Sequence, residues 1–419
     1  MTRIGIRFGL ALAALLAVVC TFAQDGWDYE VSIEARVRGE ARDNRDFFDA
    51  LNDRRDDIFG RLRLGLRMFN EEQGISLFLQ PQESYDQYYT PTRNDNDHYF
   101  DVYQAYAEFQ DSTKTWKVRG GRQDVTMGRK RLFGAGYWSN FGRSYDGLRI
   151  DHALTSHLSV TAFGGTIGSA GRRPRHPDIG LVFGEWKSKE GPAEVYYIYK
   201  HDNLSGLSHT VHTFGARAER KLKNGLDFIA EAAIQGGDYG DKNIEAMGAY
   251  LTGGYTIAAP WKPRLGFEIT YASGGDPADD KYKTFDQLFA IVHPEYGIAD
   301  YQGWRNMRAF MVDVTAVPAK NWQFRAAHHW FRLDNAKDAW YGATGGINTG
   351  AGGPYQDPTG AAGKDVGREL DLILTYKPNK AWAAEIGVAR FFPGNFIKTI
   401  NGGSAQNSDW GYLSVTWWY

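Results

Sequence analysis

The side chains of this chain best suited to chemistry are its arginines, many of which alternate with apolar residues. A guanidinium stays charged at physiological pH and binds a carboxylate through two parallel hydrogen bonds. A row of such groups along one wall would attract an anionic solute, and a low-dielectric wall would strengthen the attraction. The arginines predicted to lie on the polar face of strands are Arg36, Arg38, Arg61, Arg63, Arg67, Arg119, Arg149, Arg217, Arg325 and Arg368.

Carboxylates predicted on the same polar face offer a simpler role, in which they neutralise the arginines across adjacent strands. For any single arginine this alternative stays open. For the set we favour an anion-selective constriction, because conduction needs sites strong enough to admit a solute and weak enough to release it, and mixed charge provides both. The carboxylates are Glu30, Glu34, Glu40, Glu108, Asp151, Glu231, Glu268, Glu369 and Asp371.

The segments that carry these charges alternate with a period of two. Between residues 30 and 41 nearly every second side chain is apolar and those between are charged or polar, and residues 61–68 repeat the pattern. This period predicts strands with one apolar face. The period alone does not distinguish a sheet that faces bulk solvent from a barrel whose polar face lines a lumen.

The last strand points to a membrane. Residues 408–419 end on an aromatic carboxy-terminus, with Val415, Trp417 and Tyr419 on one face. In a transmembrane β-barrel the outward face meets lipid, Trp and Tyr mark each interface, and the last strand pairs with the first so that no edge remains. The sequence therefore predicts an outer-membrane barrel.

Composition fits the same class. The chain has 13 Trp, 24 Tyr, 24 Phe and 49 Gly, with 23% charged residues and a mean hydropathy of -0.48. After the first residues no window approaches the roughly 18 apolar residues of a membrane helix, which excludes a helical membrane protein. A secreted all-β protein, such as a lectin or propeller, remains the alternative that composition allows.

The amino-terminus is predicted to be a secretory signal peptide, residues 1–23, followed by a single barrel domain, residues 24–419. Arg3 and Arg7 precede an apolar run from Phe8 to Val19, and cleavage after Ala23 would remove Cys20, the only cysteine. A lipoprotein is disfavoured because Val19, rather than a small residue, precedes that cysteine. An exported chain without cysteine needs a large fold rather than disulfides to hold it together.

The lengths of the connections distinguish a barrel from a sandwich. Short polar turns alternate with longer segments rich in Gly, Asp and Tyr, as expected for short periplasmic turns and long extracellular loops. The count gives an all-β, antiparallel up-and-down barrel of about 18 strands, with 16 possible. The predicted short turns are 70–73, 111–115, 153–157, 187–192, 221–225, 258–262, 318–321 and 377–380, and the predicted loops are 42–57, 81–99, 126–144, 168–177, 201–209, 236–243, 273–304, 333–367 and 393–407.

Three groups of segments resemble the alginate export family of outer-membrane porins. They are RGGRQD (119–124) with RLFG (131–134) and WSNFGRSYDGLR (138–149), YASGGD (271–276) with TFDQLF (284–289), and GRELDL (367–372) with FFPGNF (391–396). The resemblance implies a monomeric barrel of 18 strands, with loops folded over its mouth or into its lumen and an arginine-rich pathway for an acidic polysaccharide. It also implies that Arg122, Arg129, Arg131, Arg143 and Arg149 line the pore.

The sequence departs from the family at Arg129-Lys130-Arg131, which is more basic than expected there. Family members also occur in bacteria that make no alginate, so the identity of the substrate does not carry over with the fold. From the alternation and the resemblance together, the predicted pore-lining residues are Arg61, Arg63, Arg119, Arg122, Arg129, Arg131, Arg143, Arg149 and Arg368.

We therefore expect an integral outer-membrane porin that gives passive passage to an alginate-like polyuronate. The alternatives are a general or small-anion and oligosaccharide uptake porin and, from other classes, an outer-membrane enzyme or an adhesin. We predict no cofactor, no catalytic residue, no metal site and no nucleic-acid partner. The expected partners are an anionic solute, outer-membrane lipid and lipopolysaccharide, the barrel-assembly machinery through the C-terminal strand, and a periplasmic scaffold protein.

Other constellations are weaker. Asp276, Asp279 and Asp280 fit no defined calcium-site spacing, and a solvated acidic loop is the simpler interpretation. His328 and His329 are adjacent on a predicted strand and must point to opposite faces, so they cannot share a metal ion. Ser208, His209 and Asp202 offer the residue types of a hydrolase without a known motif.

Overall fold

A single closed sheet forms the framework of the protein, seen in a computed structural model that describes residues 26–48, 53–90, 93–169, 176–204, 206–350 and 352–419. The predicted signal peptide lies outside the described residues. Within them, eighteen antiparallel strands make up the barrel wall, which confirms the predicted fold and strand count. They are β1 (Asp28–Asp43), β2 (Arg55–Asn70), β3 (Ile75–Thr90), β4 (Arg93–Gln110), β5 (Trp116–Gln123), β6 (Ser144–Ala153), β7 (Leu158–Ser169), β8 (Asp178–Lys187), β9 (Pro192–Leu204), β10 (Leu207–Lys221), β11 (Leu226–Tyr239), β12 (Lys242–Thr256), β13 (Arg264–Ala272), β15 (Met307–Ala316), β16 (Trp322–Arg332), β19 (Asp365–Tyr376), β20 (Trp382–Pro393) and β21 (Ser408–Trp418).

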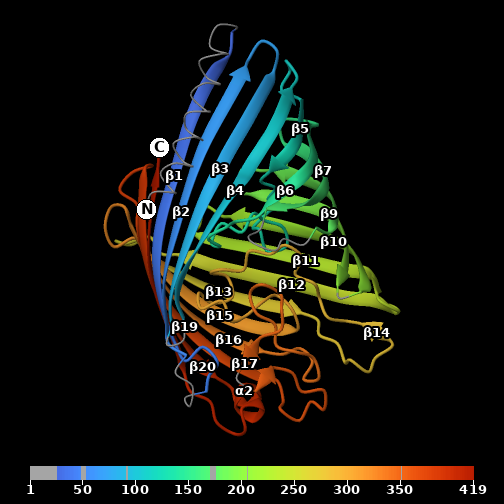
Figure 1. Cartoon of the computed structure of the whole chain (residues 1–419), viewed down its shortest axis with the longest axis vertical. Helices are drawn as coiled ribbons and strands as arrows, with labels where there is room; N and C mark the ends of the chain where they lie inside the picture. The colour runs from blue at the N-terminus through green and yellow to red at the C-terminus, as the bar shows by residue number, and fades with distance from the viewer. Residues whose placement is uncertain (1–25, 49–52, 91–92, 170–175, 205, 351) are drawn as a thin grey trace.

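The first and last strands close the barrel. β1 pairs with β2 along one edge and with β21 along the other, where Val37 lies opposite Val415 and Ala35 opposite Trp417. Figure 1 shows β1 and the red C-terminal strands side by side on the same wall. The predicted pairing of the C-terminal strand with the first strand is confirmed, and it leaves neither strand with an open edge.

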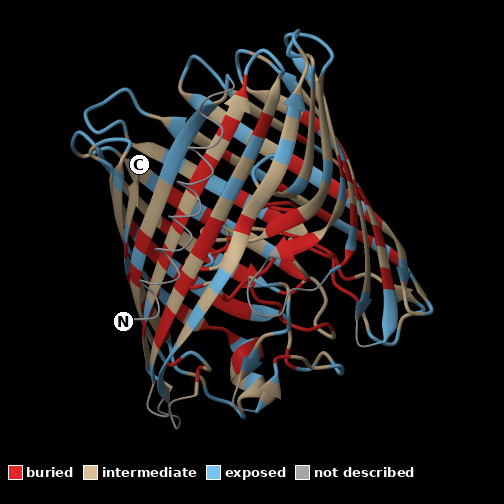
Figure 2. Ribbon diagram, turned by 45° about the horizontal axis from the view of Figure 1, so that its top comes forward, coloured by how far each residue is buried: buried red, intermediate tan, exposed pale blue. Residues whose placement is uncertain are grey.

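The alternation of the sequence sets the two faces of the wall. Val37 and Val195 point outward and are 60% and 64% exposed, whereas Arg38 and Arg61 point inward and are 4% and 6% exposed. Figure 2 shows the resulting bands of exposed and buried positions along the strands. Exposed apolar side chains on the outside are favourable only in contact with lipid, so the wall is built to stand in a bilayer.

The predicted short turns are confirmed, and all of them lie at one end of the barrel, which is the periplasmic end in barrels of this kind. At the outer end, three predicted loops are instead strand hairpins. Residues 81–90 with 93–99, 201–204 with 207–209, and 236–239 with 242–243 continue the ladders of β3 with β4, β9 with β10 and β11 with β12. Their Gly, Asp and Tyr content resembles a loop, but above the membrane both faces of a hairpin meet water, so polar strands need no apolar face there.

The long loops after β5, β13 and β16 pack together inside the barrel. We call residues 124–143 the first plug loop and residues 273–306 the second plug loop. In Figure 1 the teal segment after β5 crosses the inside of the barrel. Apolar side chains from these loops and from residues 333–364 are buried there, among them Phe133, Phe285, Trp304 and Trp340. The main apolar core therefore lies inside the barrel.

Short elements occur within these loops. They are β14 (Lys281–Tyr282), β17 (Thr349–Gly350) and β18 (Gly353–Pro354), and the helix α2 (Asn395–Ile400) lies in the connection between β20 and β21. Among the described residues, no helix has both the length and the apolar character that a membrane crossing requires.

Candidate functional site

Arginines of β1 and β2 hold the first plug loop against the wall. Arg36 donates to the carbonyl oxygens of Tyr137 at 2.9 Å and Ser139 at 3.1 Å. Arg61 donates to the same Ser139 oxygen at 2.9 Å and forms an ion pair with Glu34 at 2.6 Å. Arg38 donates to the Trp138 carbonyl at 2.7 Å. These guanidiniums position the loop and have few donors left for a solute.

Two further predicted residues also serve the plug. Arg63 donates to the Gln82 side chain at 2.6 Å and lies 3.5 Å from the centroid of the Tyr103 ring. Arg143 crosses between the two plug loops and donates to the carbonyl oxygens of Gly134 at 3.2 Å and Phe289 at 2.7 Å. Both residues lie inside the barrel as predicted, but their main contacts are with the protein.

Arg131 is the centre of a buried ionic cluster that ties the first plug loop to the second and to β13. Its two terminal nitrogens lie 2.7 and 2.6 Å from the Glu268 carboxylate, and one of them also lies 2.9 Å from Glu295. The Tyr296 hydroxyl lies at 3.1 Å and the Tyr250 ring centroid at 3.9 Å. Burial alone would lower the pKa of Arg131, but Glu268, Tyr296 and Glu295 outweigh it and raise the pKa well above its ordinary value.

Arg119 and Arg149 lie on the inner wall and are paired with carboxylates. Arg119 donates to Glu108 on β4 at 2.8 Å, and its guanidinium lies 4.1 Å from the Tyr106 ring centroid. Arg149 makes an ion pair with Asp151 two residues away at 2.8 Å. Neutralisation by neighbouring carboxylates, the alternative that the sequence left open, describes these two residues.

Arg122 and Arg368 lie on the outer face, which corrects the prediction that they line the pore. Arg122 shares its face with Trp116, which is 47% exposed, and makes a bidentate pair with Asp146 at 2.7 and 3.0 Å. Arg368 shares its face with Leu370 and lies opposite Trp330, two exposed apolar side chains. The inward residue at this point of β19 is Glu369, fully buried.

Arg129 is the predicted residue most available to a solute. It is exposed in the first plug loop, and within the described part of the chain it has no hydrogen-bond or ion-pair partner. It lines two neighbouring cavities together with Glu295. Burial alone would raise the pKa of Glu295, but Arg131 and Arg129 lower it, so the positive charge of Arg129 is felt across this space.

Three cavities follow one another through the lumen. The outer cavity, about 590 Å³, is reached from the ends of β1 and β2. The middle cavity, about 520 Å³, extends from Arg36 at mid-wall to Thr375 and Ala383 beside a short turn. The inner cavity, about 690 Å³, lies near the short turns after β10, β12 and β15. The outer and middle cavities share Trp138, Ile291 and His293, which we call the neck. The middle and inner cavities share Arg129 and Glu295.

The neck is built from both plug loops. The Trp138 and His293 rings stack with centroids 3.8 Å apart and planes 11° apart. The Arg38 guanidinium lies 4.0 Å from the Trp138 ring centroid, and His293 Nδ1 lies 3.0 Å from an oxygen of Asp300. This stacked pair, with Arg38 against Trp138 and Asp300 against His293, lies between the outer and middle cavities.

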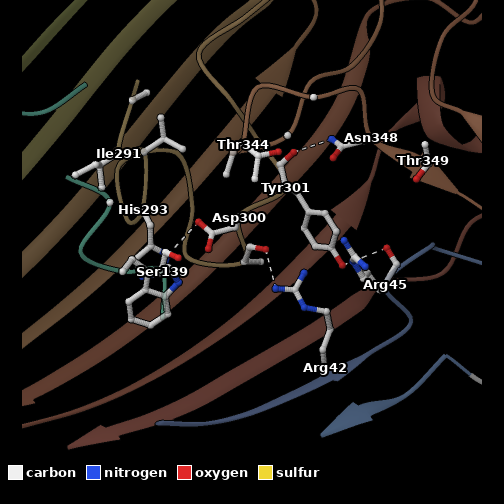
Figure 3. Close-up of a pocket in the computed structure, with 18 of the residues that line it drawn as sticks. Arg42, Arg45, Ser139, Ile291, His293, Asp300, Tyr301, Thr344, Asn348 and Thr349 are labelled. Carbon is white, nitrogen blue, oxygen red and sulfur yellow. Dashed lines mark hydrogen bonds and ion pairs between the residues drawn. The ribbon is translucent and has the colours of Figure 1, made fainter. Parts of the chain in front are cut away.

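The outer cavity combines arginines with aromatic rings. Figure 3 shows Arg42 and Arg45 beside Tyr301. Arg42 donates to the Ala299 carbonyl at 2.9 Å and lies 5.1 Å from the Tyr301 ring centroid, while Arg45 is exposed. Arg55 and Arg143 also line this cavity, facing the carboxylates of Glu40, Asp57 and Asp300. Such a surface can bind a carboxylate and pack against a sugar ring.

Sequence reasoning missed Arg42, Arg45 and Arg55 because they fall in or beside the predicted loop 42–57, where charged residues are ordinary. Four arginines in the 14 residues 42–55, with Phe47 among them, were the available signal. No grouping of His, Cys, Asp and Glu suited to a metal ion occurs among the residues that the structure describes. Asp276 instead forms an ion pair with Lys337 at 2.6 Å, and this hydrogen bond lowers the pKa of Asp276.

A closed barrel with an apolar exterior and a loop-lined, charged lumen defines the class of outer-membrane porins. Solved structures of this class are similar to the chain. OccK5 (OpdH) of Pseudomonas aeruginosa has 12% identity and a TM-score of 0.60 over 93% of this chain and 98% of that one. OprD of the same organism has 12% identity and a TM-score of 0.60 over 93% and 94%. At this identity the likeness shows the fold.

The sequence model of the alginate export family matches residues 28–411, nearly the whole chain, and the protein belongs to that family. The family and the porin fold identify an integral outer-membrane channel rather than an enzyme. Among curated protein sequences, none matches the chain.

Proposed function

We propose that the barrel gives passive passage to sugars bearing uronic-acid carboxylates, with export of an alginate-like polyuronate as its leading function. The observation that carries this proposal is the series of cavities joined by shared residues, with Arg42 and Arg45 on the outer side of the neck and Arg129 on the inner side. A polyanion moving along this series meets positive charge on both sides of the neck.

The mixed charge of the lumen fits transport rather than tight binding. Glu40 and Asp300 lie in the outer cavity with the arginines, and Glu295 lies beside Arg129, so each positive site is partly screened. A solute carboxylate is attracted without being trapped. The half-buried Trp138 and the buried rings of Tyr301 and Trp340 line the outer cavity and give it an apolar part of its wall, beside which a sugar ring can pack. Membership of the alginate export family supports the same class of solute.

A specific observation favours a second candidate, passage of small uronates or oligosaccharides. The outer cavity, about 590 Å³, is of the size of small-ligand sites, and the stacked pair Trp138–His293 lies between it and the middle cavity. A structure of the similar barrel OccK2 (OpdF), with 10% identity, a TM-score of 0.60 and coverage of 93% of this chain and 98% of that one, is described as a complex with glucuronate.

Replacing Arg129 with alanine is expected to reduce anion selectivity and to weaken block by polyuronate about fivefold, as loss of a solvated contact of about 1 kcal/mol would do. The measurement is single-channel current of the refolded protein in planar bilayers, with the reversal potential in a salt gradient and titration with polyuronate. Lys223→Ala, which removes an exposed charge from a short turn, is the matched control. Unchanged selectivity and block in Arg129→Ala would contradict the proposal.

Replacing Arg45 with glutamine is expected to weaken block by uronate added from the outer side about tenfold, because a charge-assisted contact in a partly enclosed cavity is lost. Arg54→Gln is the control, since Arg54 is exposed near the same end and pairs with Asp56 at 3.3 Å.

A series of oligouronates of increasing length separates the two candidate functions. Passage of long chains supports the polymer, whereas block by long chains with passage of mono- and disaccharides supports the small solute.

A further inference from the structure

The outer surface of the barrel carries a row of arginines that the solute pathway does not use. Arg308 on β15, Arg332 on β16, Arg368 on β19 and Arg390 on β20 belong to four neighbouring strands of the wall. All four are exposed, and each alternates along its strand with outward apolar residues such as Phe310, Trp330, Leu370 and Val388. We call these four residues the arginine row.

The row lies one membrane thickness from the periplasmic interface. β16 runs from Trp322 to Arg332 in 11 residues, and the stretch from Arg368 to Tyr376 is of similar length. A transmembrane strand tilted by about 45° needs about 9–11 residues to cross the hydrocarbon region. Trp322 and Tyr376 are paired aromatic residues at the short-turn end, where an interfacial girdle is expected. The arginine row is therefore at the level of the outer-leaflet headgroups.

The protein neutralises this row only in part. Arg308 pairs with Asp334 at 2.8 Å, and Arg390 pairs with Asp409 at 2.6 Å. Arg332 and Arg368 have no hydrogen-bond or ion-pair partner within the described residues, and Arg368 lies 5.2 Å from the Phe392 ring centroid. Arg308 lies directly opposite Arg332 in the ladder, and like charges in that position repel.

The nearby carboxylate of Asp365 does not neutralise the remaining positive charge of the arginine row. Asp365 lies opposite Arg332 in the register, but one of its oxygens accepts a hydrogen bond from the Asn395 backbone at the start of α2, at 3.3 Å. Lys364 adds a further cation beside the row and donates to the Asp334 carbonyl oxygen. The surface therefore keeps guanidinium donors that face outward at the boundary between lipid and water.

We propose that the arginine row binds the phosphate groups of the anionic glycolipid that forms the outer leaflet of the outer membrane. Guanidinium groups bind phosphate through paired, charge-assisted hydrogen bonds. The apolar residues below the row contact the acyl chains of the same molecule. The site therefore binds both the phosphate groups and the hydrocarbon part of a phosphorylated lipid. This inference is independent of the solute that passes through the lumen, because all four side chains lie on the outer face of the barrel wall and not on the face that lines the lumen.

The test uses the full barrel refolded in detergent and titrated with bisphosphorylated lipid A, with bound lipid counted by native mass spectrometry. Wild-type protein should retain lipid A, and the dephosphorylated form should bind at least about tenfold more weakly. The variant Arg332→Gln with Arg368→Gln should show the same loss. Arg54→Gln, an exposed arginine near the same end and outside the row, should bind as wild type does.

Two outcomes would overturn the proposal. One is equal retention of phosphorylated and dephosphorylated lipid, or equal retention by wild type and the double variant. The other is arginine-dependent binding of inorganic phosphate that excludes lipid A, which would make the row a site for a free anion. Single-channel conductance of the double variant should match wild type, because the lumen is unchanged, and this confirms that the variant has folded.

Discussion

Replacing Trp138 with alanine is expected to raise single-channel conductance at least about twofold, because it removes one half of the stacked pair that separates the outer and middle cavities. Trp138 lines both cavities, and its ring lies 3.8 Å from His293 and 4.0 Å from the Arg38 guanidinium. Arg38 donates to the Trp138 carbonyl oxygen, which the substitution keeps, so this hydrogen bond between the loop and the wall does not depend on the indole. The loop should therefore stay in place while the neck widens.

The matched control is Trp116→Ala. Trp116 also stacks on a histidine, His152, with centroids 3.8 Å apart, but this pair lies on the outward face. His293→Ala should raise conductance in the same direction as Trp138→Ala, and Trp138→Phe should change it less. A conductance unchanged by both Trp138→Ala and His293→Ala would show that the current is limited elsewhere in the lumen.

Replacing Arg131 with alanine is expected to cost about 3–5 kcal/mol of the free energy of unfolding, the usual result of removing one partner from a buried ion pair. Glu268 is 4% exposed and would keep a buried charge without its bidentate partner. Glu295 and the Tyr296 hydroxyl would lose the same contact. Urea unfolding in liposomes, followed by tryptophan fluorescence, measures the loss.

Two comparisons separate this effect from a general loss of charge. Glu268→Gln added to Arg131→Ala removes the uncompensated carboxylate and should restore part of the stability. Arg390→Ala breaks a bidentate pair that is exposed on the outer surface and should have a much smaller effect. If Arg131→Ala proves no more destabilising than Arg390→Ala, the buried cluster does not anchor the plug loops.

The cluster also predicts a pH dependence. Burial alone would raise the pKa of Glu295, but Arg131 and Arg129 lower it below its ordinary value. A carboxyl group with a lowered pKa in the folded state contributes stability above its unfolded pKa and loses it as the pH falls through the folded value. The plug should therefore stay anchored through neutral and mildly acidic pH and loosen only in stronger acid, which conductance at falling pH would report.

Local alternation was sufficient to predict the wall. A strand places successive side chains on opposite faces, so Val37 and Arg38 are assigned to lipid and lumen by their order in the chain alone. The aromatic end of β21 predicted closure for the same reason, since a barrel must leave no unpaired edge. Arg368 was assignable as well, because it shares its parity with Leu370 and Leu372. Arg122 follows two glycines, which carry no such signal.

Only the tertiary structure decided which inward arginines remain free for a solute. Arg61 contacts the Ser139 carbonyl, 78 residues away, and Arg131 contacts Glu268, 137 residues away. These contacts arise because the plug loops fold back into the barrel and bring their own carbonyl oxygens to the charged wall, where unpaired polar groups would otherwise be buried. The alternation of side chains along a strand is a local property, so it can be predicted from the order of the residues alone. The use of each lumen charge depends on contacts between distant segments, which local order does not specify.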